Sequence, residues 1–250
     1  MVNTAPSLCL VDVGTHMGQE YLALLGHGRL GYLRHYLRHR RRTRRKGLVP
    51  IPVAGFRAFL AAADALRRHR ASIAYVMVEP NARLFALPVY RQADHAFNIA
   101  LASDPATASL LPLFLADGNP TGQGSSLFEA KPNVSLKDYD LVINLDTLHC
   151  ARCVRANLSR QGNESGPVVL RINNEGAEVD VIHAFHQVFG VRLRAVMGSL
   201  NDVAKVKGAA ALGALHEFLA GRGIPFLPLH ADFATWPPAV VHLNGLLTIR

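Results

Sequence analysis

The chain has 250 residues, half of them hydrophobic, and a formal net charge of +9. This length is sufficient for one large domain with a sizeable core, and the composition excludes a chain that is disordered throughout. No uninterrupted apolar run approaches the roughly 20 residues that cross a bilayer. The three cysteines, Cys9, Cys150 and Cys153, are too few for a disulfide framework, so we expect a cytoplasmic protein.

Residues 8–13 predict a buried strand because they are almost uniformly apolar. A helix is expected over 17–25, where Gly26 and Gly28 follow it. The next segment is strongly basic. From Arg29 to Arg70 it contains 13 arginines and lysines and a single acid, Asp64, so the rest of the chain has a formal net charge of −3. After two prolines this segment predicts a helix over 56–70.

The density of cations from Arg34 to Lys46 suggests an anionic partner, either a lipid surface or nucleic acid. A solvated charge run without a partner is the alternative. Lipid binding would place the protein peripherally at a membrane surface.

A buried strand over 73–78 ends at Glu79, and further β segments are expected at 97–102 and 110–116. A loop at 117–133, rich in Gly, Pro, Ser and Asn, is long enough to be functional. Strands at 140–145, 168–172, 191–197 and 224–229 then alternate with helices at about 147–159, 177–189 and 206–220. This alternation predicts one α/β domain over residues 1–250, with a doubly wound, mostly parallel, Rossmann-like sheet.

The spacing of the first two strands indicates an insertion. Gly18 and Glu79 lie about 60 residues apart, whereas a βαβ unit needs about 30. We therefore interpret residues 29–70 as a basic helical insertion in the first crossover.

Asp12 and Glu79 each stand at the end of a predicted parallel strand, where α/β sheets bind ligands. Gly14 and Gly18 permit a tight turn after the first strand. That turn does not read G-x-G-x-x-G, which argues against a pyrophosphate-binding dinucleotide fold. It suits S-adenosylmethionine (SAM), whose ribose hydroxyls a lone acid such as Glu79 can bind. Ordinary loop acids are the alternative interpretation.

Five motifs occur in the order found in one enzyme family: Val11-Asp-Val-Gly-Thr-His-Met-Gly-Gln19, Glu79-Pro-Asn81, Gly124-Ser-Ser-Leu127, Leu145-Asp-Thr-Leu148 and Leu170-Arg-Ile-Asn-Asn-Glu-Gly-Ala-Glu178. Over residues 8–200 the chain resembles FkbM-type SAM-dependent methyltransferases. The resemblance implies a seven-stranded class I methyltransferase sheet. It also implies methyl transfer to a hydroxyl of a sugar, glycan or natural product.

The resemblance also implies roles for individual residues. Asp12 and Gly14 would line the methionine end of SAM, and Glu79 would bind the ribose. The segment 98–102 that ends in Ala102, with Ser103 and Asp104, would lie beside the adenine, and Ser125 would belong to the loop 124–126 that covers the site. Gly18 and Asn81 complete the expected cofactor site. The acceptor pocket would be built from 117–133 and the C-terminal segment 231–250.

Asn173, Glu175 and His16 are the candidate catalytic residues. The family usually has an Asp where this chain has Asn173, and an amide can position a hydroxyl but cannot act as a base. His16 could take a proton, although a structural loop histidine is equally compatible with the sequence. Glu175 and Glu178 could instead simply begin a helix.

His149, Cys150 and Cys153 form half of a zinc-site pattern without a second pair of ligands, so we predict no metal. Two further functional classes stay open. The first is a weakly active or inactive SAM-fold protein that binds nucleic acid or anionic membrane through its basic insertion. The second is an RNA methyltransferase, which the absence of an Asn/Asp-Pro-Pro-Tyr motif disfavours. The acceptor and the oligomeric state are left open.

Overall fold

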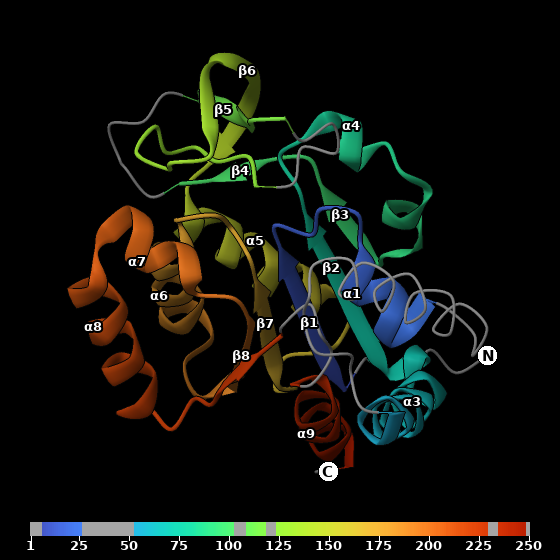
Figure 1. The fold of residues 1–250 in the computed structure, drawn as a ribbon. Coiled ribbons are helices and arrows are strands. Elements are labelled where there is room, and N and C mark those ends of the chain that lie inside the picture. Colours follow the sequence, from blue (N-terminus) through green and yellow to red (C-terminus); the bar gives the residue numbers. More distant parts are fainter. Residues whose placement is uncertain (1–6, 27–52, 103–108, 119–123, 230–234, 249–250) are drawn as a thin grey trace.

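The computed structural model describes residues 7–26, 53–102, 109–118, 124–229 and 235–248. At its centre is a six-stranded sheet in the order β3-β2-β1-β7-β8-β9, in which every pairing is parallel (Figure 1). The predicted α/β, Rossmann-like architecture is confirmed. The strands are β1 (Leu8–Val13), β2 (Ile73–Val78), β3 (His95–Phe97), β7 (Val168–Ile172), β8 (Leu193–Gly198) and β9 (Phe226–Pro228).

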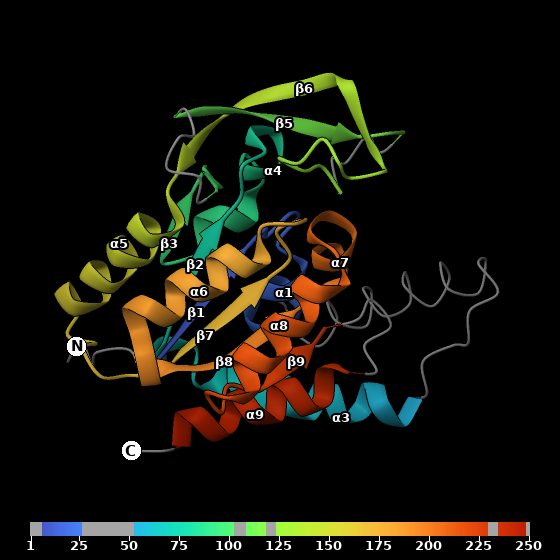
Figure 2. The same ribbon diagram turned by 90° about the vertical axis from the view of Figure 1, so that its left-hand side faces the viewer.

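Helices cover both faces of this sheet, which explains why β1, β2 and β7 are buried along their whole length. One face packs against α1 (Gln19–Tyr21), the π-helical turn Leu22–Gly26, α3 (Val53–Arg68) and α9 (Trp236–Thr248). The other packs against α5 (Thr147–Arg160), α6 (Glu178–Phe189), α7 (Asn201–Lys207) and α8 (Ala209–Ala220). Figure 2 shows α3 and α9 side by side along one side of the molecule.

The expected seventh strand of the main sheet is not found among the described residues. The segment predicted as 140–145 is the end of a longer strand, β6 (Val134–Leu145), which lies in a separate sheet of order β4-β6-β5 with β4 (Ala100–Leu101) and β5 (Leu110–Ala116). Tyr139, Leu141 and Ile143 are exposed on β6 while Val142 is buried. This alternation belongs to a strand with one solvated face, unlike the fully buried strands of the main sheet.

Several predicted boundaries shift for local reasons. The helix expected at 206–220 is interrupted: α7 ends at Lys207 and α8 begins at Ala209, because Gly208 adopts φ 88° and ψ 163° between them. The helix expected at 17–25 has α geometry only over α1 and continues as a π-helix. The remaining elements of the described residues are α4 (Ala82–Phe85) and three 3₁₀ turns at Arg70–Ser72, Pro88–Gln92 and Gly190–Arg192.

The C-terminal helix α9 was not predicted, and it packs against α3. The Asn244 Nδ2 donates to the Ala62 carbonyl at 2.8 Å, and the Phe59 and Trp236 rings meet edge to face. Within the predicted basic insertion, residues 53–68 thus form a crossover helix that packs on the sheet and on α9. Residues 27–52, which include Arg34–Lys46, lie outside the described residues.

The order of the main sheet reverses between β1 and β7. In open α/β sheets, ligands bind outside the carboxyl ends of the strands at such a point. In this chain the small sheet lies over that end of the main sheet (Figure 1).

Candidate functional site

A pocket lies at the carboxyl ends of β1, β2 and β7, beneath the small sheet. Its lining comprises Gly14, His16, Glu79, Pro80, Asn81, Leu84, Ala100, Leu113, Gly124, Ser125, Ser126, Leu127, Asn173, Asn174 and Glu175. Six separate parts of the chain therefore meet around one space. Among the described residues that line it, two are acids and none is a lysine or arginine.

The turn after β1 forms one wall of this pocket. Gly14, His16 and Gly18 all have positive φ, at 72°, 54° and 66°. A Cβ on Gly14 would lie 2.0 Å from the Asn173 carbonyl oxygen, so the turn passes directly against the end of β7. Only glycine permits that approach. Gly18 is packed against Val89 and does not line the pocket.

Glu79 joins the ends of β1 and β2. Its Oε2 accepts from the His16 N–H at 2.8 Å, and its Oε1 accepts from the Asn81 N–H at 2.9 Å. The side chain is buried yet lines the pocket. Burial raises the pKa of Glu79 to about 7, although the two N–H donors favour its ionised form. Each oxygen retains a lone pair that a ligand hydroxyl can use.

Two further predicted residues near Glu79 have structural partners. The Asn81 side chain caps α4, accepting from the Arg83 and Leu84 N–H groups. Ala102 follows β4, and its N–H donates to the Asn144 Oδ1 at 3.0 Å. Ala102 is not among the described lining residues, and Ser103 and Asp104 lie outside the described residues.

Asp12 lies beneath the turn and not in the pocket lining. Its Oδ1 accepts from the Arg171 Nη1 at 2.9 Å, and its Oδ2 accepts from the Tyr75 hydroxyl at 2.8 Å. Arg171 also donates to the Gly14 carbonyl at 2.7 Å and forms an ion pair with Glu20 at 2.5 Å. Both side-chain oxygens of Asp12 are therefore engaged within the protein, and Arg171 links them to the turn.

The turn after β7 supplies two of the three candidate catalytic residues. Asn173 donates its N–H to the Val13 carbonyl at 3.0 Å and lines the pocket beside Gly14. Glu175 lines it as well, with φ 54°. Glu178 instead accepts from the Asn174 and Gly176 N–H groups, both at 2.9 Å, and is fully buried. Burial raises the pKa of Glu178 to about 7. Glu178 thus holds the turn that presents Glu175.

The third candidate, His16, lines the pocket and has its main chain fixed by neighbouring side chains. Its N–H donates to Glu79, and its carbonyl accepts from the Tyr90 hydroxyl at 2.5 Å. The ring is therefore held on a restrained segment of the turn after β1.

The predicted loop at 117–133 contributes the upper wall through Gly124–Leu127. The Ser125 hydroxyl accepts from the Ala116 N–H at 3.2 Å, and the Ser126 hydroxyl donates to the Glu175 carbonyl at 2.8 Å. Lys131 is buried, forms an ion pair with Glu175 and donates to the Gly124 carbonyl at 2.9 Å. By contrast, the described part of 231–250 lies against α3 and contributes no lining residue.

Two residues that hold this site were not predicted. Lys131 stands in a loop without a motif, so nothing in the sequence marks it. Arg171 did give a signal, because a buried strand that is apolar on both sides of an arginine needs acids to pair with it.

The cysteines of the possible half zinc site lie in ordinary structural surroundings. Cys150 packs in the core against the sheet, whereas Cys153 is exposed on the same helix. No three histidine, cysteine or acidic side chains among the described residues come together in a way that could hold a metal ion. No helix in the described part of the chain is long and apolar enough to cross a membrane.

Comparisons of the chain with models of protein families, with curated proteins and with solved structures found no match.

Proposed function

We propose that the protein is a SAM-dependent methyltransferase that acts on a hydroxyl of a sugar, glycan or natural product. The observation that supports this most is the charge of the pocket, whose described lining contains Glu79 and Glu175 but no lysine or arginine. SAM carries two positive groups, a sulfonium and an ammonium, and one carboxylate. Its net positive charge is therefore opposite in sign to the acids of the pocket. A pyrophosphate would meet two acids and no lysine or arginine in the described lining.

A dinucleotide is the nearest alternative ligand, because the sheet order β3-β2-β1-β7-β8-β9 is also that of dinucleotide-binding Rossmann folds. Pyrophosphate sites use a glycine-rich turn that leads into the N-terminus of a helix. Here the turn lacks that motif, and α1 spans only Gln19–Tyr21 before the helix becomes π-helical. Both features favour SAM over a dinucleotide.

Each lining group has a role in the proposed reaction. Glu79 binds the ribose hydroxyls, and the apolar Leu84, Leu113 and Leu127 help to exclude water. The Asn173 amide orients the acceptor hydroxyl in line with the methyl group. The acceptor oxygen then bonds to the methyl carbon as the carbon–sulfur bond breaks, and its electron pair stays on sulfur. Glu175 is the pocket carboxyl nearest in sequence to Asn173.

Glu79→Ala is expected to weaken binding of both SAM and its demethylated product, S-adenosylhomocysteine (SAH), by roughly 1.5–3 kcal/mol, because charge-assisted ribose hydrogen bonds are lost. Titration calorimetry measures both affinities. Glu217→Ala, an exposed acid on α8 outside the pocket lining, is the matched control and should bind normally. Equal affinities for Glu79→Ala and the control would remove Glu79 from the ribose site.

SAH affinity should also depend on pH through Glu79. The pKa of Glu79 is about 7 in the free protein, and ribose hydroxyls bind best to its ionised form. Lowering the pH below 7 therefore protonates Glu79 and should weaken binding by up to about tenfold per pH unit. The side chain in Glu79→Gln cannot titrate, so this variant shows how much of the pH dependence of SAH binding comes from groups other than Glu79. A profile that is the same in Glu79→Gln and the wild type would contradict the assignment.

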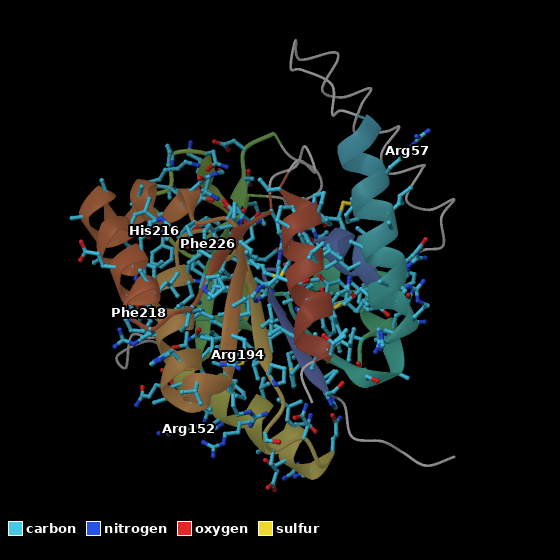
Figure 3. The ribbon with its side chains drawn as sticks, turned by 90° about the horizontal axis from the view of Figure 1, so that it is seen from below. Arg57, Arg152, Arg194, His216, Phe218 and Phe226 are labelled. Atoms are coloured by element: carbon cyan, nitrogen blue, oxygen red, sulfur yellow. The ribbon has the colours of Figure 1, made fainter. Side chains whose placement is uncertain are left out.

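A second candidate function is favoured by the basic run at Arg34–Lys46, which would bind an anionic membrane or nucleic acid in an inactive SAM-fold protein. The described arginines form no comparable run: Arg57 lies on α3, Arg152 on α5 and Arg194 on β8 (Figure 3). The third candidate, methylation of RNA, would use the same run to hold its substrate.

Charge reversal at Arg40, Arg41, Arg42, Arg44 and Arg45 is expected to leave SAM binding nearly intact. It should abolish association with anionic vesicles or RNA, and in the wild type that association should fall steeply as salt rises. Co-sedimentation measures the association with vesicles, and filter binding measures the association with RNA. If the wild type binds neither anionic vesicles nor RNA at low salt, the basic run is a solvated segment that does not bind an anionic partner.

A further inference from the structure

Asn174 lines the pocket at the end of β7, and the nitrogen of its side chain has no hydrogen-bond partner. This Nδ2 atom is also shielded from solvent. A buried amide nitrogen without an acceptor is uncommon in folded proteins, because it gives up hydrogen bonds to water and gains none in return. In the wall of a pocket, such a group indicates that a ligand supplies the acceptor.

The main chain around Asn174 is held in place by its neighbours. The Asn174 N–H donates to the Glu178 Oε1 at 2.9 Å, and the Asn174 carbonyl accepts from the Ala177 N–H at 3.5 Å. The Glu178 Oε2 accepts from the Gly176 N–H at 2.9 Å. The side chain of Asn174 therefore starts from a fixed backbone. Because rotation about its last bond exchanges the amide oxygen and nitrogen, it can present the donor to a ligand.

The position of Asn174 in the sheet order indicates which part of the cofactor it meets. A Cβ on Gly14 would lie 3.4 Å from the Asn174 Cα, so the turns after β1 and β7 are in contact. Glu79, the proposed ribose ligand, follows β2 on the other side of β1, and the segment expected beside the adenine follows β3. In the order β3-β2-β1-β7, the end of SAM that remains for Asn174 is the amino-acid tail.

The carboxylate of that tail needs a hydrogen-bond donor in this pocket. The described lining has Glu79 and Glu175, which favour the sulfonium and the ammonium group, but no lysine or arginine that could pair with a carboxylate. A carboxylate without a cation beside it is stabilised by hydrogen bonds from neutral donors. The Asn174 amide is such a donor, and its nitrogen has no acceptor within the protein.

We propose that Asn174 binds the carboxylate of the methionine moiety of SAM through its side-chain Nδ2, and that the pocket thereby selects a nucleoside with an amino-acid tail. This inference rests on the proposed function. It gives Asn174 a role in cofactor binding and leaves its neighbour Asn173 with the acceptor hydroxyl. The two amides at the end of β7 then serve different ligands.

The test compares SAH with its decarboxylated form, which keeps the adenosine, the sulfur and the amine but lacks the carboxylate. Titration calorimetry at pH 8 measures both dissociation constants. We expect the wild type to bind SAH at least about tenfold more tightly, because the decarboxylated form cannot accept the charge-assisted hydrogen bond. The acids of the pocket by themselves favour the more positive, decarboxylated ligand. Equal affinities, or tighter binding of the decarboxylated form, would overturn the proposal.

Two variants test whether this preference comes from Asn174. Asn174→Leu nearly keeps the size of the side chain but removes its hydrogen bonds, so SAH should bind about tenfold to a hundredfold more weakly while the decarboxylated form binds almost as before. Asn174→Asp places a carboxylate against the ligand carboxylate and should also weaken SAH alone. Asn201→Leu, at an exposed asparagine that begins α7 outside the pocket lining, is the matched control and should keep the wild-type preference.

The outcomes separate the role of Asn174 from the proposed function. If the wild type prefers SAH but both Asn174 variants keep that preference, another group holds the carboxylate, and the cofactor assignment stands without Asn174. Equal weakening of both ligands in Asn174→Leu and Asn174→Asp would likewise contradict a contact with the carboxylate. If the wild type binds neither ligand, the proposed function itself is wrong. The comparison of the two ligands on the wild type does not depend on any variant folding.

Discussion

Arg171→Met is expected to lower the free energy of unfolding by about 3–5 kcal/mol, because it leaves buried acids without their counter-charge. Arg171 is the cation that pairs with both Asp12 and Glu20, and all three side chains are buried. Burial already raises the pKa of Glu20, and Arg171 acts against that rise. Urea denaturation followed by circular dichroism measures the loss.

The loss should shrink as the pH falls from 8 towards 5. Without Arg171 the folded-state pKa of Glu20 rises further, so protonation of Glu20 relieves part of the uncompensated charge at low pH. Arg160→Met, an exposed arginine at the end of α5, is the control and should change stability by less than about 0.5 kcal/mol. A loss in Arg171→Met as small as that of the control would show that the buried acids do not depend on this cation.

Gly14→Ala should be the most damaging small substitution in the pocket. A left-handed alanine costs about 1–2 kcal/mol, and the overlap of its Cβ with the Asn173 carbonyl adds about 1–3 kcal/mol. The chain offers a matched control in Gly223, whose φ of 65° is similar but whose Cβ would meet nothing within 4 Å. Gly223→Ala therefore isolates the cost of conformation alone.

Because the overlap separates β1 from β7, Gly14→Ala should also reduce SAH binding, whereas Gly223→Ala should not. Denaturation and calorimetry on the same two proteins measure both effects. Equal losses of stability in the two variants would mean that the turn can move away from Asn173 at no cost, and that the close approach does not shape the pocket.

The main sheet could be predicted because burial on both faces leaves a plain signal. Strands β1, β2 and β7 are short, almost wholly apolar runs, and each was located from the sequence to within one residue. The same signal misled at β6. Its last residues include several apolar side chains and were therefore predicted as a strand of the main sheet. In the structure β6 belongs to the small sheet, and Tyr139, Leu141 and Ile143 are exposed. Apolar content alone does not reveal which sheet buries a strand.

The position of Glu79, Asn173 and Glu175 around one pocket follows from topology, since the ends of adjacent parallel strands meet at one edge. The role of Asp12 could not be read in the same way. Whether a strand-end acid faces a ligand or the protein depends on its partners, and the decisive partner, Arg171, is 159 residues away. Lys131 likewise reaches Glu175 from an irregular segment, 44 residues away in the sequence.

The most direct test of the proposed cofactor is calorimetric titration of the wild-type protein with SAM and with NAD under identical conditions. A pocket with two acids and no described lysine or arginine in its lining should bind SAM in the micromolar range, about −8 kcal/mol, and NAD far more weakly. Tight binding of NAD with no heat from SAM would contradict the account and make the sheet a dinucleotide-binding fold.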